Sequence, residues 1–321
     1  MASFDVITVG RVSVDLYPQQ IGVELPDVHS FTKSLGGSAT NVAVAAARLG
    51  TRATVITKVG DDPFGEYVRR SLREFGVDPR FVSTDPHLRT PLAFCEIHPP
   101  DRFPILFYRH PKAPDMNLGY DDMPLEQIVD CDLFWTTGTG LADEPSRSAT
   151  LAALDARSRS ARFAPHGRIT VHDLDHRPAL WESEEDATRM AREAVRHATV
   201  VVGNTEEVAM ATGSSDPLEA SATLLEQGAQ VAIVKRGGEG VLAQTATGGV
   251  IEVPAVQVEV KNGLGAGDAF GGALCHGLVS GWELERALRF ANAAGAIVAS
   301  RMLAADDMPT EREVEALLAA A

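Results

Sequence analysis

One stretch of the chain indicates both its fold class and its chemistry, and it reads Asn262-Gly263-Leu264-Gly265-Ala266-Gly267-Asp268-Ala269-Phe270-Gly271-Gly272. Residues 256–260 before it alternate apolar and polar side chains as a strand does, and the chain from Ala269 onward has the pattern of a helix. We therefore expect a strand-to-helix turn, because such a turn needs backbone conformations that glycine adopts at little cost.

This turn is predicted to bind an anion beside a base. The first N–H groups of a helix lack acceptors, so the backbone of Gly265, Ala266 and Gly267 suits a phosphate or a developing oxyanion. Asp268 would repel such an anion, and accepting a proton from an attacking hydroxyl is the task that fits it. The alternative is a glycine turn that only packs a helix against a sheet. The P-loop and dinucleotide motifs are excluded, because Asp268 and Phe270 stand where they need other residues.

Composition sets the broad class. The chain has 321 residues, 45% of them hydrophobic, which is ample for a buried core in one or two α/β domains. Its net charge of −15 argues against nonspecific binding to nucleic acid or anionic membranes.

No apolar run approaches the ~20 residues that span a bilayer, and Met1-Ala2-Ser3-Phe4-Asp5 lacks a basic leader, so a cytoplasmic protein is expected. Three widely spaced cysteines, Cys95, Cys131 and Cys275, predict reduced thiols.

Strand and helix patterns alternate along the chain. We expect strands at 4–9, 52–59, 131–137, 168–174, 198–202, 230–234, 240–244 and 249–253. Helices are expected at 40–49, 62–75, 183–197, 205–212, 217–227, 283–299 and 310–320. This alternation predicts an α/β fold with a mainly parallel sheet covered by helices.

One region interrupts the alternation. Pro91–His98 and Phe103–His110 both have strand patterns, and residues 99–102 between them leave room only for a turn. With the segment 12–35, which also alternates, this hairpin is expected to form a small projecting β-sheet. Such a sheet over a cleft would be a lid, and the alternative is an edge hairpin with no such role. We therefore expect one domain, 1–321, with lid segments at about 12–35 and 88–112.

A second glycine motif, combined with the first, carries a family resemblance. It reads Leu35-Gly36-Gly37-Ser38-Ala39-Thr40-Asn41-Val42-Ala43. Further matching pieces are Gly10 with Asp15, Asn204-x-x-Glu207, Lys235-x-Gly237-x-x-Gly240 and Phe290-Ala291-Asn292-Ala293-Ala294-Gly295. In their order and spacing they resemble the ribokinase-like (pfkB) family of carbohydrate kinases over nearly the whole chain. The resemblance implies a three-layer α/β/α fold with a small β-sheet lid.

The resemblance also implies roles. Asp268 would be the general base that activates a sugar hydroxyl toward the γ-phosphate of ATP, and the amides of Gly265, Ala266 and Gly267 would stabilise the transferred group. Glu207 would act on Mg²⁺ through water. The positions around the nucleotide would be Asn204, Lys235, Gly237, Gly240 and Asn292.

Simpler structural roles stay open for several of these residues. Glu207 could be a favourable charge in the first turn of a helix, Gly237 and Gly240 could shape a hairpin, and Asn292 could be a buried helix residue. One departure concerns Asn262-Gly263, where the family usually has Asp-Thr. That Asp is associated with a monovalent cation in some members, so use of a monovalent cation is left open.

Two arginines indicate which class of sugar accepts the phosphoryl group. Arg109 lies on the expected hairpin and Arg177 follows an expected core strand, and arginine pairs well with carboxylates. Surface salt bridges are the alternative for each. Segments that include Thr90-Pro91-Leu92-Ala93-Phe94 and Ala113-Pro114-Asp115 resemble kinases of keto-deoxy sugar acids. The substrate-binding set implied is Asp15, Gly37, Asn41, Arg109 and Arg177, with a plain turn residue as the alternative for Asp15.

The resemblance of these segments implies ATP-dependent phosphorylation of 5-dehydro-2-deoxy-D-gluconate, a sugar acid of myo-inositol breakdown, at its C6 hydroxyl. The alternatives are 2-keto-3-deoxygluconate, then a neutral sugar such as fructose, and finally a catalytically silent sugar-binding member of the fold. ATP and Mg²⁺ are the expected cofactors. A homodimer through the lid edge is the expected assembly.

Overall fold

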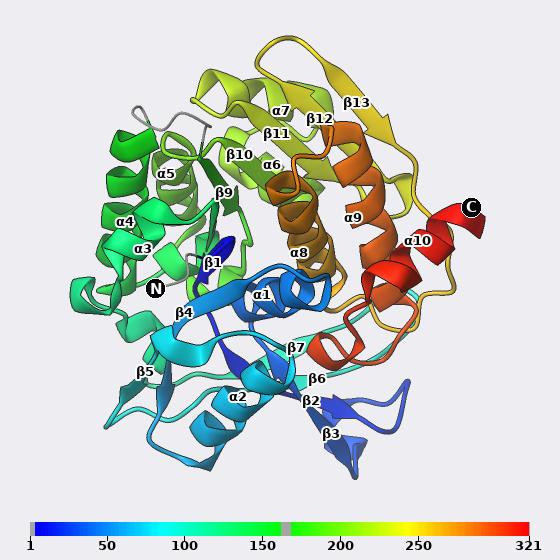
Figure 1. Cartoon of the computed structure of the whole chain (residues 1–321). Helices are drawn as coiled ribbons and strands as arrows, with labels where there is room; N and C mark the ends of the chain where they lie inside the picture. Colours follow the sequence, from blue (N-terminus) through cyan, green and yellow to red (C-terminus); the bar gives the residue numbers. More distant parts are fainter. Residues whose placement is uncertain (1–3, 162–167, 321) are drawn as a thin grey trace.

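The computed structural model describes residues 4–161 and 168–320 (Figure 1). Met1–Ser3, which belong to the stretch examined for a leader, lie outside these ranges. The main sheet has the order β13-β12-β11-β10-β9-β8-β1-β4-β5. All neighbours in it are parallel except β11–β12 and β12–β13. Its strands are β1 Val6–Val9, β4 Ala53–Gly60, β5 Val82–Asp85, β8 Leu133–Thr137, β9 Ile169–Asp173, β10 Val200–Asn204, β11 Val231–Lys235, β12 Val241–Thr245 and β13 Val250–Val253.

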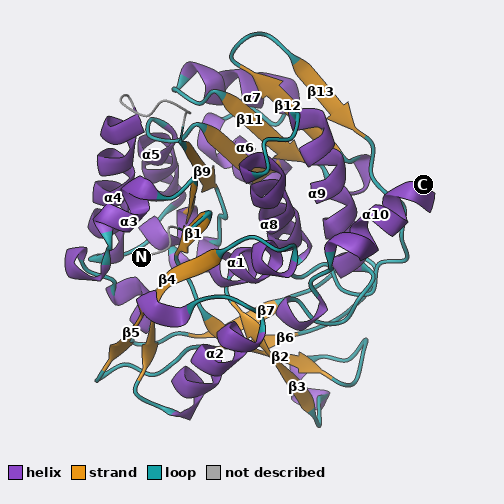
Figure 2. Ribbon diagram, in the orientation of Figure 1, coloured by secondary structure: helices purple, strands orange, loops and turns teal. Residues whose placement is uncertain are grey.

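Helices cover both faces of this sheet (Figure 2). One layer is α1 Ser38–Arg48, α2 Pro63–Glu74, α8 Ala266–Val279 and α9 Leu284–Ala299, with α10 Glu311–Ala320 packed on α9. The other is α3 Leu125–Asp130, α4 Ser146–Ala161, α5 Glu184–Val195, α6 Thr205–Thr212 and α7 Pro217–Glu226. Alternate strand residues enter opposite cores, so that Val6 packs with the first layer and Ile7 with the second.

The expected alternation of strands and helices is confirmed, with ends that differ by a few residues. The sequence patterns missed α3, α4 and β5. In α4 the buried face carries polar side chains, including Thr150 and Arg157. Arg157 donates to the carbonyls of Cys131 at 2.7 Å and Asp132 at 2.9 Å. A helix that buries a guanidinium in this way shows little apolar periodicity.

The strand expected at 256–260 is absent, so that prediction was wrong. Val256 packs on the core but the segment has no strand partner, so its alternation reflects one packed side only. The chain reaches the glycine turn along the end of α9, where the N–H groups of Lys261 and Asn262 both donate to the carbonyl of Ala299.

The small second sheet is confirmed and has the order β3-β2-β6-β7. Its strands are β2 Ser13–Pro18, β3 Phe31–Gly36, β6 Leu92–Cys95 and β7 Ile105–Tyr108. The hairpin β6–β7 is antiparallel as expected but shorter, and β2 joins it by pairing in parallel with β6. In Figure 1 this sheet lies below the main body, beside the ends of α1 and α8.

One face of the small sheet packs on the glycine turn. Tyr17 and Cys95 form a buried cluster with Ala304, to which Phe103 and Leu264 add their side chains. A Cβ on Gly263 would lie 3.0 Å from the ring of Phe103. Among the described residues, no helix is long and apolar enough to cross a membrane.

Candidate active site

Polar residues gather where neighbouring parallel strands of the main sheet end. Arg11 follows β1, Thr139 follows β8, Asp175 follows β9, Asn204 ends β10 and Lys235 ends β11. The carboxyl ends of parallel strands share one edge of a sheet, and ligands of α/β proteins bind there. The starts of α1 and α8 and one face of the small sheet complete this site.

The glycine turn supplies free backbone donors. Gly265 is the residue before α8 and has φ 84°, a left-handed conformation that favours glycine. Within the described ranges the N–H groups of Gly265, Gly267 and Asp268 have no acceptor, whereas that of Ala266 makes a long 3.4 Å contact with the Gly263 carbonyl. Asp268 is the third residue of α8, so the helix starts earlier than expected and the carboxylate lies in its first turn.

Two donors hold the carboxylate of Asp268. Ser38 Oγ donates to one oxygen at 2.9 Å and Asn41 Nδ2 donates to the other at 2.8 Å. Burial raises the pKa of Asp268 above its ordinary value, against the hydrogen bonds from Asn41 and Ser38, which lower it. The carboxylate is thus oriented, partly accessible and more basic than an ordinary aspartate.

Asn41 has one polar atom without a partner. Its Oδ1 is buried and accepts no hydrogen bond within the described residues, while Nδ2 is committed to Asp268. A buried acceptor of this kind suits a hydroxyl group of a ligand. The tight start of α1 makes this possible, because Gly37 has φ 96° and a Cβ there would lie 2.4 Å from the Arg11 carbonyl.

Asp15 lies across the site on β2. Its carboxylate covers Gly36, where a Cβ would come within 2.1 Å of it. Burial raises the pKa of Asp15 to about 6, although a hydrogen bond from Ser13 and the charges of Arg11 and Arg109 act to lower it.

The two arginines expected to bind a carboxylate are both paired with protein carboxylates. Arg109 is buried and forms an ion pair with the fully buried Asp115, whose other oxygen accepts the N–H of Val12 at 2.9 Å. Arg177 is 3.3 Å from Asp175 and its side chain keeps 43% exposure. Of the two, Arg177 is therefore more available to a ligand.

Asn204 and Glu207 form a reciprocal cap at the start of α6. Asn204 Oδ1 accepts the N–H of Glu207 at 2.8 Å, and Glu207 Oε2 accepts the N–H of Asn204 at 2.7 Å. The structural role considered for Glu207 is therefore real. Burial also raises the pKa of Glu207, against the charge of Lys235.

Lys235 faces the glycine turn, because a Cβ on Gly267 would lie 3.6 Å from Lys235 Nζ. It is also 3.6 Å from Asp173. Burial alone would lower the pKa of Lys235, but the surrounding carboxylates raise it. Those carboxylates are Asp173, Glu207, Asp268 and Asp175. Four acids around one ammonium group and Arg177 fit a site that also takes a divalent cation, whose preferred ligands are oxygens.

Gly240 and Asn292, two residues expected near the nucleotide, both contact the segment that follows β13. A Cβ on Gly240 would collide with the Val253 carbonyl, and Asn292 Nδ2 donates to the Pro254 carbonyl at 2.7 Å. Gly237 has open space around it. Residues 253–257 and Asn292 line a hollow together with Leu317 and Leu318 of α10.

Asn262 is fully buried and connects the turn to the chain after α9. Its Nδ2 donates to the Met302 carbonyl at 2.9 Å, and its Oδ1 accepts the N–H of Leu264 at 2.9 Å. An aspartate could not make the first bond. The departure from the usual Asp thus has a structural role of its own.

Sequence reasoning missed several residues of this site, namely Arg11, Ser38, Asp115, Thr139, Asp173 and Asp175. A signal existed for Asp173 and Asp175, because carboxylates that follow a buried strand lie at the ligand-binding edge. Arg11 follows an expected strand, but its partner Asp175 lies 164 residues away in the chain. Asp115 is six residues from Arg109, but it also accepts the N–H of Val12, which lies 103 residues away.

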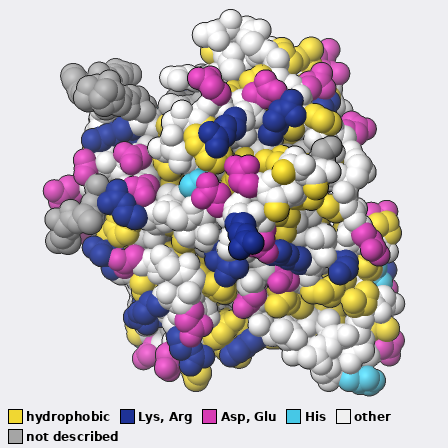
Figure 3. Space-filling view, turned by 45° about the vertical axis from the view of Figure 1, so that its right-hand side comes forward, with side chains coloured by type: hydrophobic (Ala, Val, Ile, Leu, Met, Phe, Trp, Pro, Cys, Tyr) yellow, Lys and Arg dark blue, Asp and Glu magenta, His cyan; other side chains and the backbone are white. Residues whose placement is uncertain are grey.

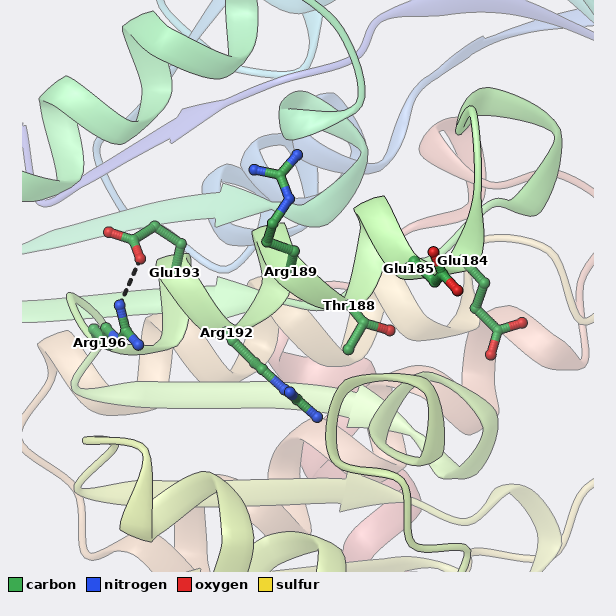
Figure 4. Close-up of a pocket in the computed structure, with 7 residues that line it drawn as sticks. All are labelled: Glu184, Glu185, Thr188, Arg189, Arg192, Glu193 and Arg196. Carbon is green, nitrogen blue, oxygen red and sulfur yellow. Dashed lines mark hydrogen bonds and ion pairs between the residues drawn. The ribbon is translucent and has the colours of Figure 1, made fainter.

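Figure 3 shows basic and acidic side chains intermingled across the middle of one face of the molecule. Another hollow lies along α5, and Figure 4 shows the charged side chains that line it. Arg189 and Arg192 point in opposite directions there, and Arg196, the residue after α5, pairs with Glu193 at 2.8 Å. None of the site residues described above lines this hollow.

Comparisons with known proteins agree on one family. Residues 3–311 match the pfkB family carbohydrate kinase. The chain is 36% identical to a 5-dehydro-2-deoxygluconokinase of Photobacterium profundum over 96% of this chain and 92% of that protein. It is 32% identical to the protein of the same name from Bacillus subtilis over 99% and 97%.

Solved structures show the same architecture. A putative ribokinase II from E. coli in complex with ATP and Mg²⁺ superposes with a TM-score of 0.89 at 25% identity, over the whole of both chains. A fructokinase from Vibrio cholerae O395 in a fructose, ADP and potassium ion bound form superposes with a TM-score of 0.85 at 26% identity, over 99% of each chain.

Proposed function

The chain belongs to the pfkB family of carbohydrate kinases, and we propose that it transfers the γ-phosphoryl group of ATP to the C6 hydroxyl of 5-dehydro-2-deoxy-D-gluconate. The observation that carries the chemistry is Asp268, an oriented carboxylate of raised pKa beside backbone N–H groups that lack acceptors.

In this proposal Asp268 removes the proton of the C6 hydroxyl as that oxygen attacks in line. The amides of Gly265, Ala266 and Gly267 bind the transferred phosphoryl group, with the N–H of Ala266 turning from its long contact with Gly263. Lys235, which faces Gly267, adds a positive charge on the same side. The base and the anion-binding groups then act on opposite ends of the bond that forms.

The nucleotide is proposed to lie along the ends of β10, β11 and β12, with Asn204, Lys235, Gly237, Gly240 and Asn292 around it. Glu207 would act on Mg²⁺ through water, because its Oε1 has no hydrogen-bond partner within the described residues. When bound, Mg²⁺ supplies charge neutralisation on the phosphates. The cap between Asn204 and Glu207 keeps both side chains at a fixed position at the end of β10.

The preference for a sugar acid is supported by charge and by the relatives. Arg177 carries a partly exposed guanidinium, and the charge of Arg109 reaches Asp15 across the site. Asp15, Gly37 and Asn41 would hold sugar hydroxyls, the last through its unpartnered Oδ1. The relatives named above share the name of the enzyme for this substrate.

We also propose that the small sheet is a lid and that its outer face pairs with a second copy of the chain. Residues of that face alternate with those facing the site, and they include Phe31, Phe94, Leu106 and Tyr108. Phe94 contacts both Phe31 and Tyr108, with ring centroids 5.4 and 5.2 Å apart, and Tyr108 is 60% exposed. An apolar face ending in the edge strand β7 suits a symmetric dimer.

The test is ATP consumption with Mg²⁺ on four acceptors: 5-dehydro-2-deoxygluconate, 2-keto-3-deoxygluconate, fructose and ribose. Selective turnover of the first supports the proposal. A preference of more than tenfold for either neutral sugar would remove the sugar-acid assignment, and selective turnover of 2-keto-3-deoxygluconate would replace the substrate. Absence of turnover with all four would favour another acceptor or a silent member of the fold.

A further inference from the structure

Arg11 is a buried arginine in the site to which neither the motifs nor the proposed mechanism gives a role. It follows Gly10 at the end of β1 and is 5% exposed. Its Nε donates to Thr139 Oγ1 at 2.8 Å, and its Nη2 donates to the carboxylate of Asp175 at 2.9 Å. These contacts hold the guanidinium plane in one orientation, because they engage two nitrogens of a rigid group.

Asp175 positions the guanidinium of Arg11. It is buried and has φ 26°, an uncommon backbone conformation for a residue other than glycine. Besides Arg11 its carboxylate accepts a hydrogen bond from Thr139 Oγ1 at 2.7 Å and pairs with Arg177 at 3.3 Å. Backbone strain of this kind concentrates at functional sites. A single carboxylate thus orients two guanidinium groups.

The third guanidinium nitrogen of Arg11, Nη1, is available to a ligand. Within residues 4–161 and 168–320, Nη1 has no hydrogen-bond partner, yet it is not among the polar atoms sealed from solvent. The ring of Phe107 on the small sheet lies 5.9 Å from the guanidinium carbon. Phe107 shares a sheet face with Asp15. The charge of Arg11 acts to lower the pKa of Asp15, but no hydrogen bond joins the two side chains. The guanidinium therefore lies beside the face of the small sheet that carries Asp15 and Phe107, and Nη1 is its nitrogen left for a ligand.

We infer that Arg11 contacts the substrate and determines specificity, with Nη1 donating to a keto or carboxylate oxygen of the sugar acid held between Asp15 and Arg177. The inference rests on the proposed function and extends it to a residue outside the arginine pair already assigned. A guanidinium only donates hydrogen bonds and is always charged, so it favours an oxygen that only accepts over a neutral hydroxyl. Thr139 and Asp175 are positioning residues, since they act by orienting Arg11.

The first experiment replaces Arg11 by lysine, which keeps the charge but loses the planar fork. We expect the KM for 5-dehydro-2-deoxygluconate to rise roughly tenfold to hundredfold, the range for a lost charged hydrogen bond. The KM for ATP should change by less than about twofold, because ATP binds away from Arg11. Arg80→Lys is the matched control. Arg80 also pairs with an aspartate, Asp78, and lies 5.0 Å from the ring of Phe4, but it is on the surface.

Two further measurements separate substrate contact from a structural role. Thr139→Val keeps the guanidinium and its Asp175 partner, and removes the hydroxyl that accepts from Arg11 and donates to Asp175. It should therefore raise the same KM by a smaller factor even if Arg11→Lys folds poorly. For both variants the ratio of kcat/KM for the sugar acid to kcat/KM for fructose should fall, whereas loss of structure lowers both constants together.

The outcomes distinguish the inference from the proposed function. Wild-type protein that phosphorylates the sugar acid, with Arg11→Lys and Thr139→Val keeping its KM or losing both activities in parallel, overturns the role of Arg11 alone. Wild-type protein that phosphorylates only neutral sugars overturns the proposed function and, with it, the inference.

Discussion

Asn41 Nδ2 donates a 2.8 Å hydrogen bond to Asp268, and this bond joins the starts of two helices that are 227 residues apart in the chain. Each helix starts after a glycine with positive φ, Gly37 for α1 and Gly265 for α8. The two glycine motifs of the sequence are therefore the two halves of one site. In the proposed mechanism one half supplies the base and free N–H groups, and the other orients that base and offers an acceptor to a substrate hydroxyl.

Replacing Asp268 by asparagine should abolish most turnover. The amide cannot accept the hydroxyl proton, so kcat should fall by roughly 10²-fold to 10⁴-fold, the usual range for loss of a general base. ATP binding, measured by calorimetry, should be largely unchanged. Asp121→Asn, at an exposed aspartate, is the matched control. A fully active Asp268→Asn enzyme would show that another group is the base.

The stability of the protein should depend on Asp15 in a defined pH window. Its folded pKa of about 6 lies above the ordinary value of 3.8, so the protonated form is favoured by folding. Its stabilising contribution is full below about pH 3.8 and is lost as pH rises through about 6. The melting temperature of Asp15→Asn, relative to wild type, should therefore increase between pH 4 and pH 6 and then stay constant. A pH-independent difference would argue against a raised pKa.

The ionisation of Asp15 should also appear in the pH dependence of kcat/KM. There the change runs the other way, because the ionised form is the one that binds substrate. If ionised Asp15 binds a substrate hydroxyl, wild-type kcat/KM should rise with pH through about 6. In Asp15→Asn this limb should be missing and kcat/KM should be low throughout. A wild-type limb retained unchanged in the variant would assign it to another group, with Asp268, whose pKa is also raised, as the next candidate.

Lys235→Met should weaken ATP use more than sugar binding. The substitution removes the ammonium group that faces Gly267 and leaves the buried Asp173 without its cation. We expect the KM for ATP to rise roughly tenfold to hundredfold and the KM for the sugar acid to change little. Lys112→Met is the control, because Lys112 also pairs with an aspartate, Asp143 at 3.1 Å, at a more exposed position. Equal changes in both KM values would contradict a specific nucleotide role.

Asn262→Asp should make the protein respond to monovalent cations. The wild-type amide donates to the Met302 carbonyl, whereas a carboxylate there would face that carbonyl without a donor. The variant should have a lower melting temperature in tetramethylammonium chloride and recover part of it in potassium chloride at equal ionic strength. Wild type should melt alike in both salts. A wild-type protein that itself needs potassium for activity would contradict this account of Asn262.

Tyr108→Glu should dissociate the proposed dimer. It places a charge on the outer face of the small sheet, and sedimentation should then give the monomer mass of 34.2 kDa. Tyr120→Glu is a close control, since Tyr120 is 61% exposed but belongs to the segment 120–122 outside the small sheet. If wild type is already a monomer at micromolar concentration, or if Tyr108→Glu remains dimeric, the lid is not the interface.

Local patterns predicted the elements that have strong periodicity or strict backbone needs. Asp62 accepts the N–H groups of Phe64 and Gly65 at the start of α2, where the helix expected at 62–75 begins. The strands of the main sheet other than β5 were recognisable because each is an apolar run between turn signals. The patterns failed where the buried side chains do not follow the apolar periodicity of the element. One case is α4, which buries Arg157, and the other is 256–260, which packs on one side but has no strand partner among the described residues.

The sequence by itself determined the class of fold, the two glycine turns and the carboxylate between free N–H groups, because these depend on neighbouring residues and on conformations that glycine allows. Tertiary structure alone decided which charges meet. Arg109 is committed to Asp115, Arg177 shares Asp175 with Arg11, and Lys235 faces Gly267. Such contacts depend on distances of a few ångströms that the order of the strands and the packing of the small sheet set. This holds whether the partners are 164 residues apart, as Arg11 and Asp175 are, or only six, as Arg109 and Asp115 are.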